Sequence, residues 1–327
     1  MKKFLAFLLA AMLLLSVGAV AVAEETKVKD ATIGKVVTIT GTDAKMPVET
    51  FNFTIINNSV TDAADGVTSE NMPTPTLASV TFNEGDTGTE KNITIIYPTY
   101  ESVGIYSYTV KETPGNTAGM TYAEKEYTLV VYVVNDDVNG GVKVAGSKLA
   151  DANNKKHDKF ENKYEAGSLA VTKVVAGELG EKGKTFNFTV TFTQPQDKVA
   201  RSTISYLVGT ETKTLTFTNG TATANISLKD GETITFNNVP YTVSYNVTED
   251  NANKDDNGTI KNGDYVVNYN NCNGTISAAT TTATVTNTKG GTIDTGITTD
   301  SLPYVMLLGF VILAGAALII KRRVAHN

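Results

Sequence analysis

Apolar and polar residues alternate along most of the chain, and this alternation predicts β-strands. The clearest case is residues 169–175, Leu-Ala-Val-Thr-Lys-Val-Val, because successive side chains of a strand point to opposite faces. Leu169, Val171 and Val175 then share one face, and Lys173 lies among them. An unpaired ammonium buried there would be costly, so this lysine must reach water, find a partner or lose its charge.

The same arrangement occurs earlier in the chain. Residues 33–39 place Lys35 on one face with three aliphatic residues. Both lysines begin a Lys-Val-Val triplet, and each is followed by Thr-Phe-Asn-Phe, at residues 50–53 and 185–188. The sequence therefore predicts two related units, each organised around one lysine on an apolar face.

Short strand-like segments separated by turn residues continue through both units, and between the two ends of the chain no long segment has apolar residues at helical spacing. This pattern predicts an all-β protein with two tandem immunoglobulin-like β-sandwich domains, at residues 24–165 and 166–290. The predicted strands of the first domain are residues 32–40, 50–56, 79–82, 92–97, 104–112, 126–134 and 160–164, with a hairpin within 136–159. Those of the second are 169–175, 185–193, 213–218, 221–227, 233–236, 241–249, 265–269 and 283–287.

The two ends of the chain predict export and anchoring. Residues 1–23 have a basic start, an apolar run and a small-residue cleavage site, which is typical of a cleaved signal peptide. Residues 291–327 contain the uncharged stretch 302–320, long enough to span a bilayer as a helix, followed by three basic residues. An uncleaved N-terminal anchor and a plain single-span C-terminal anchor are the alternatives.

Composition limits the function classes. The formal charge of −6 and the pI of about 5.1 argue against a nucleic-acid partner. The one cysteine, Cys272, has no partner for an internal disulfide and no neighbouring acid or histidine to make it a nucleophile. We therefore expect no cofactor, no metal ion and no enzyme activity on other molecules; a surface hydrolase has little support in a chain with two histidines.

Each unit also carries a glutamate and an asparagine at matching places. Glu112 ends the sequence Ser-Tyr-Thr-Val-Lys-Glu, and Glu249 ends Ser-Tyr-Asn-Val-Thr-Glu. Strand alternation places each carboxyl group on an apolar face. Asn162 and Asn287 stand among apolar residues where each unit closes. The lysine precedes the glutamate by 77 positions in the first unit and by 76 in the second.

This repeated order predicts a reactive cluster. Burial lowers the pKa of a lysine and raises that of a glutamate, so the amine becomes nucleophilic and the acid can donate a proton. The amine would attack the asparagine side-chain carbonyl, which the acid polarises, and loss of ammonia would leave an amide cross-link. The alternative is a buried Lys–Glu ion pair with a hydrogen-bonded asparagine, and the repetition favours the cross-link.

These residues resemble a known family. The first unit looks like the isopeptide-linkage domain of streptococcal-type backbone pilins, and the second is similar to the Cna B-type domains of such pilins. The matching residues are 35–37, 50–53, 104–112 and 160–162 in the first unit, and 171–173, 239–240, 245–249 and 287 in the second. The resemblance implies spontaneous Lys–Asn bonds assisted by a glutamate: Lys35, Glu112 and Asn162 in one domain, and Lys173, Glu249 and Asn287 in the other.

The C-terminal segment resembles a cell-wall sorting signal, in which a short motif precedes the apolar span. The family pattern is Leu-Pro-x-Thr-Gly, and only Thr295 and Gly296 match it. No Tyr-Pro-Lys pilin motif is present, so the lysine that accepts the next subunit is assigned by position, to Lys155 or Lys156 in the lysine-rich stretch before Asn162.

The resemblance implies the structural shaft subunit of a covalent, sortase-assembled pilus, exported and attached to the cell wall. Its expected partners are further copies of itself, joined head to tail, a pilin sortase, tip and basal pilins, and the membrane through a transient C-terminal helix. The alternative is a monomeric wall-anchored adhesin or minor pilin that binds a host ligand.

Overall fold

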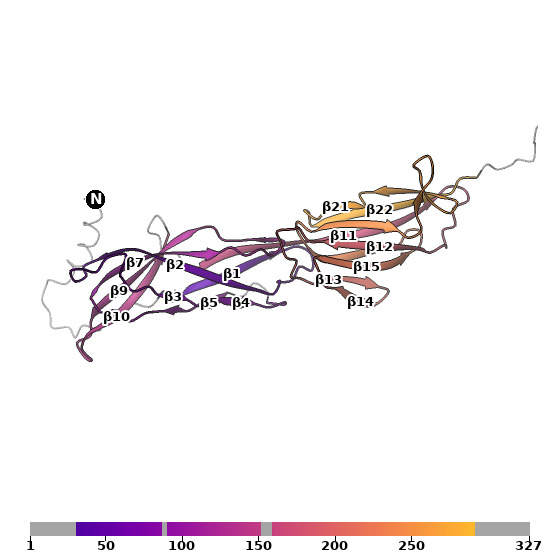
Figure 1. Ribbon diagram of the computed structural model, residues 1–327. Helices are drawn as coiled ribbons and strands as arrows, with labels where there is room; N and C mark the ends of the chain where they lie inside the picture. The colour runs from indigo at the N-terminus through magenta and orange to yellow at the C-terminus, as the bar shows by residue number, and fades with distance from the viewer. Residues whose placement is uncertain (1–30, 87–89, 152–158, 292–327) are drawn as a thin grey trace, which may run out of the picture. The chain divides into compact units, whose positions relative to one another are not determined.

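The computed structural model describes residues 31–86, 90–151 and 159–291 (Figure 1). Every regular element among them is a β-strand, as the alternation predicts, and none of them forms a helix that could cross a membrane. The predicted signal peptide and sorting segment lie outside the described residues. The chain divides into two compact units between Glu165 and Ala166, and Gln196–Ser202 belongs to the first of them.

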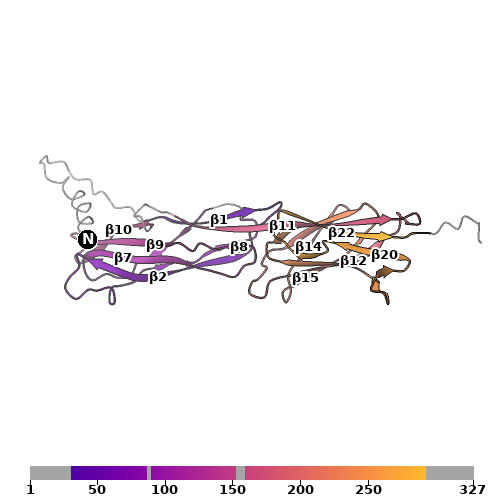
Figure 2. The same cartoon turned by 90° about the horizontal axis from the view of Figure 1, so that it is seen from above.

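The first unit is built from two facing sheets. One has five strands in the order β10-β9-β7-β2-β4, and its first four lie side by side in Figure 2. In the other, β1 pairs with β5 and with the N-terminal part of β11, which also pairs with β8. A small ladder joins β3 to β6. The strands are β1 (Ile33–Thr40), β2 (Glu49–Thr61), β3 (Thr76–Leu77), β4 (Val80–Phe82), β5 (Lys91–Ile93), β6 (Ile95–Ile96), β7 (Gly104–Thr113), β8 (Met120–Thr121), β9 (Glu126–Asn135), β10 (Val142–Ala150) and β11 (Lys159–Ala176).

Aromatic rings fill the space between these two sheets. The ring of Phe160, on β11, lies 5.0 Å from that of Phe53 on β2 and 4.9 Å from that of Tyr127 on β9. On β7 every second residue is buried, from Tyr106 to Glu112. The strict alternation explains why this strand forms: its apolar face is removed from water, and its other face stays partly exposed.

The second unit repeats this design. Its four-stranded sheet has the order β15-β12-β17-β21, and its other sheet has the order β14-β13-β16-β11-β22-β20-β19-β18. Between the two sheets, the ring centres of Phe192 and Phe236 lie 5.3 Å apart, and those of Phe186 and Tyr265 are also 5.3 Å apart. The strands after β11 are β12 (Phe186–Thr193), β13 (Ile204–Val208), β14 (Glu211–Leu215), β15 (Thr221–Leu228), β16 (Thr233–Pro240), β17 (Ser244–Glu249), β18 (Asn253–Lys254), β19 (Ile260–Asn262), β20 (Tyr265–Asn270), β21 (Asn273–Thr275) and β22 (Thr280–Thr288).

The structure differs from the predicted strands in several places, and the short strands β3, β8, β18, β19 and β21 were not predicted. Residues 160–164 and 169–175 are parts of the single strand β11, because Ala166 and Gly167 pair with β16 instead of forming a loop. β13 was not predicted: its inward residues Ile204 and Tyr206 are followed by exposed Leu207 and Val208, which obscures the alternation. Residues 92–97 form two short strands, β5 and β6, with different partners.

A segment from the second half of the sequence completes the first unit. Val199 N–H donates to the carbonyl oxygen of Asn116 at 2.8 Å, and Ala118 N–H donates to that of Val199 at 2.9 Å. The buried hydroxyl of Tyr164 donates to Ser202 Oγ at 3.0 Å. The first unit is therefore complete only when the chain has been made as far as residue 202.

Candidate functional site

The core of the first unit brings Lys35, Glu112 and Asn162 together from β1, β7 and β11. Lys35 Nζ lies 3.0 Å from Glu112 Oε2. Asn162 Nδ2 donates to the other oxygen of the same carboxyl group, Oε1, at 2.5 Å. All three residues are at most 3% exposed, so water does not separate the amine, the carboxyl group and the amide.

The second unit holds the same cluster. Lys173, on β11, lies with its Nζ 3.3 Å from Glu249 Oε2, on β17. Asn287, on β22, donates from Nδ2 to Glu249 Oε1 at 2.7 Å. These three residues are also at most 3% exposed. The structure thus groups all six predicted reactive residues into two sites, with one carboxyl group between the two nitrogens in each.

Strand register explains why the sites match. The strands that carry the lysine and the asparagine are parallel neighbours, and the asparagine stands opposite the residue two positions after the lysine: Val37 pairs with Asn162, and Val175 pairs with Asn287. In the facing sheets, the second phenylalanine of each Thr-Phe-Asn-Phe sequence pairs with the glutamate. Equal register brings the same three side chains together in both units.

Burial lowers the pKa of both reactive lysines. It lowers the pKa of Lys35 to about 8, against the opposing effect of the Glu112 carboxylate. The pKa of Lys173 is also lowered, first by burial, with Glu249 opposing. Each Nζ lies 4.5 Å from the centre of a phenylalanine ring, Phe51 or Phe186, the first phenylalanine of each Thr-Phe-Asn-Phe sequence. The site therefore supplies a neutral amine at a much lower pH than a solvated lysine would.

The amide orientation differs from the expectation that the acid polarises the carbonyl. Ala123 N–H donates to Asn162 Oδ1 at 2.9 Å. Because a backbone N–H can only donate, this bond fixes the amide oxygen on that side and turns Nδ2 toward Glu112. The carboxyl group of Glu112 therefore bridges the attacking nitrogen and the leaving nitrogen, which suits it to carry a proton from one to the other.

Sequence reasoning missed several neighbours of the two sites. Glu49 is a second buried carboxyl group in the first unit: Tyr122 Oη donates to its Oε1 at 2.5 Å, and burial raises its pKa. In the second unit Asn262 Nδ2 donates to Glu249 Oε1 at 2.6 Å. Of these, only Glu49 has a signal in the sequence, since it directly precedes the first Thr-Phe-Asn-Phe.

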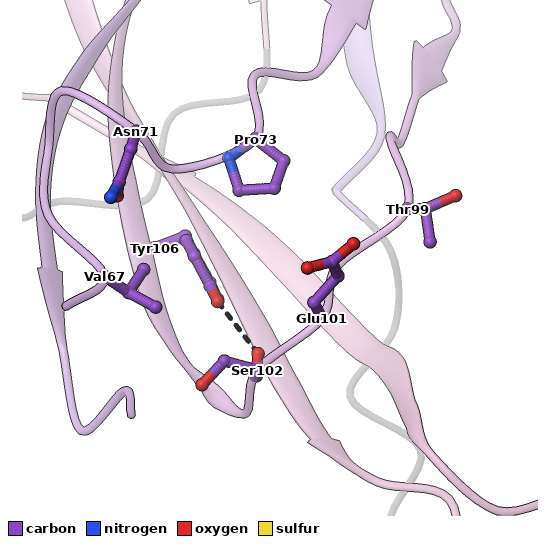
Figure 3. A pocket seen from close by; sticks show the side chains of 7 residues that line it. All are labelled: Val67, Asn71, Pro73, Thr99, Glu101, Ser102 and Tyr106. Atoms are coloured by element: carbon purple, nitrogen blue, oxygen red, sulfur yellow. Dashed lines mark hydrogen bonds between the residues drawn. The ribbon is translucent and has the colours of Figure 1, made fainter. Parts of the chain in front are cut away.

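Other candidate features lie apart from this chemistry. Cys272 is buried, which raises the pKa of its thiol to about 11, and the described residues contain no cluster of three or more side chains suited to a metal ion. A hollow of about 350 Å³ lies in the first unit. Tyr106 and Ser102 line it, and Tyr106 Oη donates to the carbonyl oxygen of Ser102 (Figure 3). Tyr106 precedes Glu112 by six positions on β7, about 20 Å along a strand, so the hollow is not the reactive site.

Four predicted site residues lie outside the described residues: Thr295 and Gly296 of the sorting motif, and the candidate acceptors Lys155 and Lys156. The neighbouring Lys159 is described; its Nζ lies 3.6 Å from Glu90 Oε2, and its side chain is partly exposed.

Comparison with known proteins finds two matching domain families and a streptococcal relative. Residues 31–165 match the family described as the Spy0128-like isopeptide containing domain, and residues 167–289 match a domain of unknown function, DUF7601. A pilin of Streptococcus pyogenes serotype M1 is 28% identical over 334 residues, which cover 95% of this chain and 96% of the relative. Together these matches support a backbone pilin of Gram-positive bacteria.

Solved structures resemble this chain in fold. A major pilin from Streptococcus pyogenes, 23% identical, covers 81% of this chain and 99% of its own with a TM-score of 0.57. The major pilin T3.2 from serotype GAS13637 of the same species, also 23% identical, covers 80% and 98% with a TM-score of 0.55.

Proposed function

We propose that this pilin is the shaft subunit of a surface pilus whose two domains are each locked by an internal Lys–Asn isopeptide bond. The observation that carries the proposal is the repeated cluster of lysine, glutamate and asparagine in the core of both domains. A shaft subunit transmits tension, and a covalent tie across each core suits that task. The relationship to pilins over almost the whole chain supports the same function.

Three side chains are enough to form the proposed bond and release ammonia. The neutral amine of Lys35 attacks Cγ of Asn162, and the Glu112 carboxylate accepts a proton from Nζ. The carboxyl group returns that proton to Nδ2, the Cγ–Nδ2 bond breaks, and ammonia leaves. The folded core holds these groups in contact, so proximity supplies much of the rate without any other enzyme. Lys173, Glu249 and Asn287 react in the same way.

Intact mass spectrometry tests the internal bonds. Each bond releases one ammonia, so recombinant residues 24–290 should weigh about 34 Da less than the sequence mass. Glu112→Ala should restore about 17 Da, and Glu249→Ala the other 17 Da. A mass equal to the sequence value would refute the internal bonds and leave two buried ion pairs.

Polymerisation requires a second kind of bond. In the proposed reaction a sortase cysteine attacks the carbonyl carbon of Thr295 and releases the peptide that begins at Gly296. The amine of Lys155 or Lys156 on the next subunit then displaces the cysteine, and an amide joins the two chains. Signal-directed export and final attachment to the cell wall complete this assembly, in which tip and basal pilins would occupy the ends.

Fibres from the cell wall test this assembly. Extracts should give a ladder of bands resistant to sodium dodecyl sulfate, and tandem mass spectrometry should find a branched peptide that joins Thr295 to Lys155 or Lys156. A branch at another lysine would remove the acceptor assignment. Monomers without any branch would favour the wall-anchored adhesin instead.

A further inference from the structure

We propose that the backbone N–H of Ala123 is an oxyanion donor for the first cross-link, and that the second site, which lacks such a donor, closes more slowly. The inference rests on the proposed internal bonds and explains why the two bonds would form at different rates. The group involved is a backbone N–H, not a side chain.

The donor is held in place by the same strand that carries the reacting amide. Ala123 follows β8, and β8 pairs with β11 through Thr121 opposite Lys163, next to Asn162. The preceding residue, Tyr122, is fixed by its hydroxyl, which accepts from Thr117 N–H at 2.9 Å and donates to the buried Glu49. The N–H therefore points at Asn162 Oδ1 before the reaction begins.

Charge develops at this oxygen when the amine attacks. As the Nζ–Cγ bond forms, the carbonyl electron pair moves onto Oδ1, which becomes an oxyanion. A donor already 2.9 Å from that atom stabilises the charged state more than the neutral amide. Loss of one such donor slows acyl-transfer enzymes by about 10²–10³-fold. Glu112 cannot supply this contact, because it faces Nδ2.

The second site differs at this point. Asn287 Oδ1 is buried, and none of the described residues places a hydrogen-bond donor within reach of it. Its glutamate also receives a second amide donor, because Asn262 Nδ2 as well as Asn287 Nδ2 contacts Glu249 Oε1. That second contact ties the Glu249 carboxyl group to an amide that does not react. The missing donor at Asn287 Oδ1 is the difference that slows the second closure.

A timed synthesis of the full chain tests the proposal. The chain is translated in a cell-free system in a short labelled pulse, samples are quenched in urea at intervals, and each is digested. Mass spectrometry then measures the fraction of the Lys35–Asn162 and Lys173–Asn287 branched peptides separately. In the unaltered chain the first branched peptide should form at least about 10-fold faster than the second.

A backbone change then tests the donor itself. Replacing Ala123 by lactic acid through suppressor tRNA exchanges the N–H for an ester oxygen and keeps the side chain. Formation of the first branched peptide should slow by at least about 10-fold, and the second should be unaffected. Ala123→Gly, which keeps the N–H, is the matched control and should close at the rate of the unaltered chain.

The outcomes are separable. Closure of the first site at an unchanged rate in the ester chain, or a second site that closes as fast as the first, would overturn the role of Ala123 and leave the internal bonds intact. Absence of both branched peptides from the unaltered chain would overturn the proposed function instead. Folding of the ester chain is checked in the Asn162→Ala background, where its melting temperature should stay within a few degrees of that parent.

Discussion

The cross-link of the first domain should contribute about 4–5 kcal/mol to that domain's free energy of unfolding, and a double-mutant cycle can isolate this contribution. Asn162→Ala removes the bond together with the amide contacts to Glu112 and Ala123. In a Glu112→Gln background the bond cannot form, because the amide side chain cannot carry the proton, so the same Asn162→Ala change removes contacts alone. Asn162→Ala thus lowers the free energy of unfolding by one amount in the unaltered background and by another in the Glu112→Gln background. The difference between these two amounts is the contribution of the covalent closure.

The magnitude follows from the length of chain that the bond closes. Lys35 and Asn162 are 127 positions apart, and by the loop-entropy relation used for disulfides this closure is worth about 4–5 kcal/mol in free energy of unfolding. For a domain of this size the same energy corresponds to a melting temperature about 15 °C higher. Lys173 and Asn287 are 114 positions apart, so the equivalent cycle with Glu249→Gln should give almost the same value.

Hydrogen exchange in guanidinium, followed by mass spectrometry, suits a chain with two domains. Peptides from β7 and β9 report unfolding of the first domain, and peptides from β12 and β15 report the second domain as an internal reference. The first-domain cycle should yield a coupling of about 4–5 kcal/mol and leave the reference peptides unchanged. A coupling below about 1 kcal/mol would refute the closure argument.

Three further predictions follow from the same contacts. Burial lowers the pKa of Lys35 to about 8, so the fraction of Lys35 in the neutral form rises with pH. First-site closure should therefore accelerate about 10-fold per pH unit up to about pH 8 and then level off. A closure rate independent of pH between 6 and 9 would contradict attack by the free amine. Single-molecule pulling should extend Asn162→Ala by up to about 400–450 Å more than the unaltered chain, which is the length of the 126 residues otherwise held inside the loop; equal extensions would mean that no bond shields them. Tyr164→Phe removes the hydroxyl that donates to Ser202 and should lower first-domain stability by about 0.5–1.5 kcal/mol in the exchange assay, whereas Tyr241→Phe, in the second domain, should leave it unchanged.

Strand alternation could place the reactive side chains because it depends only on local geometry. Lys35 and Glu112 were predicted to lie on apolar faces from a period of two residues, and both are buried. Asn162 and Asn287 also stand among apolar residues, but the repeated order of residues and the resemblance to pilins were needed to mark them as reactive. The all-β prediction followed from the same alternation and is confirmed for the described residues.

Long-range pairing could not be derived in this way. No local pattern shows that β1 and β11 run parallel with Val37 opposite Asn162. This register depends on the path of the whole chain between Lys35 and Asn162, which are 127 positions apart. The segment Gln196–Ser202 folds back onto the first unit through backbone bonds, which carry no sequence signal, and through side-chain bonds of Arg201 and Ser202 to distant residues. Ala123 is the extreme case, because its contribution is a backbone N–H, which every residue except proline possesses.

Parallel pairing also decides what the two bonds do under tension. In each domain the strand that enters and the strand that leaves are neighbours, β1 with β11 and β11 with β22, and a pull on the two ends would shear them apart. When the isolated chain is pulled by its two ends, a Lys35–Asn162 bond would carry that force from β1 into β11, and a Lys173–Asn287 bond would carry it on into β22. In a fibre joined at Lys155 or Lys156 the force would enter β11 directly, and only the second bond would lie in its path. Because β11 holds both Asn162 and Lys173, only the short backbone between them joins the two bonds. The residues enclosed by each loop, which form most of both cores, are then spared from tension, so the same register that brings the reacting groups together also makes their bond mechanically useful.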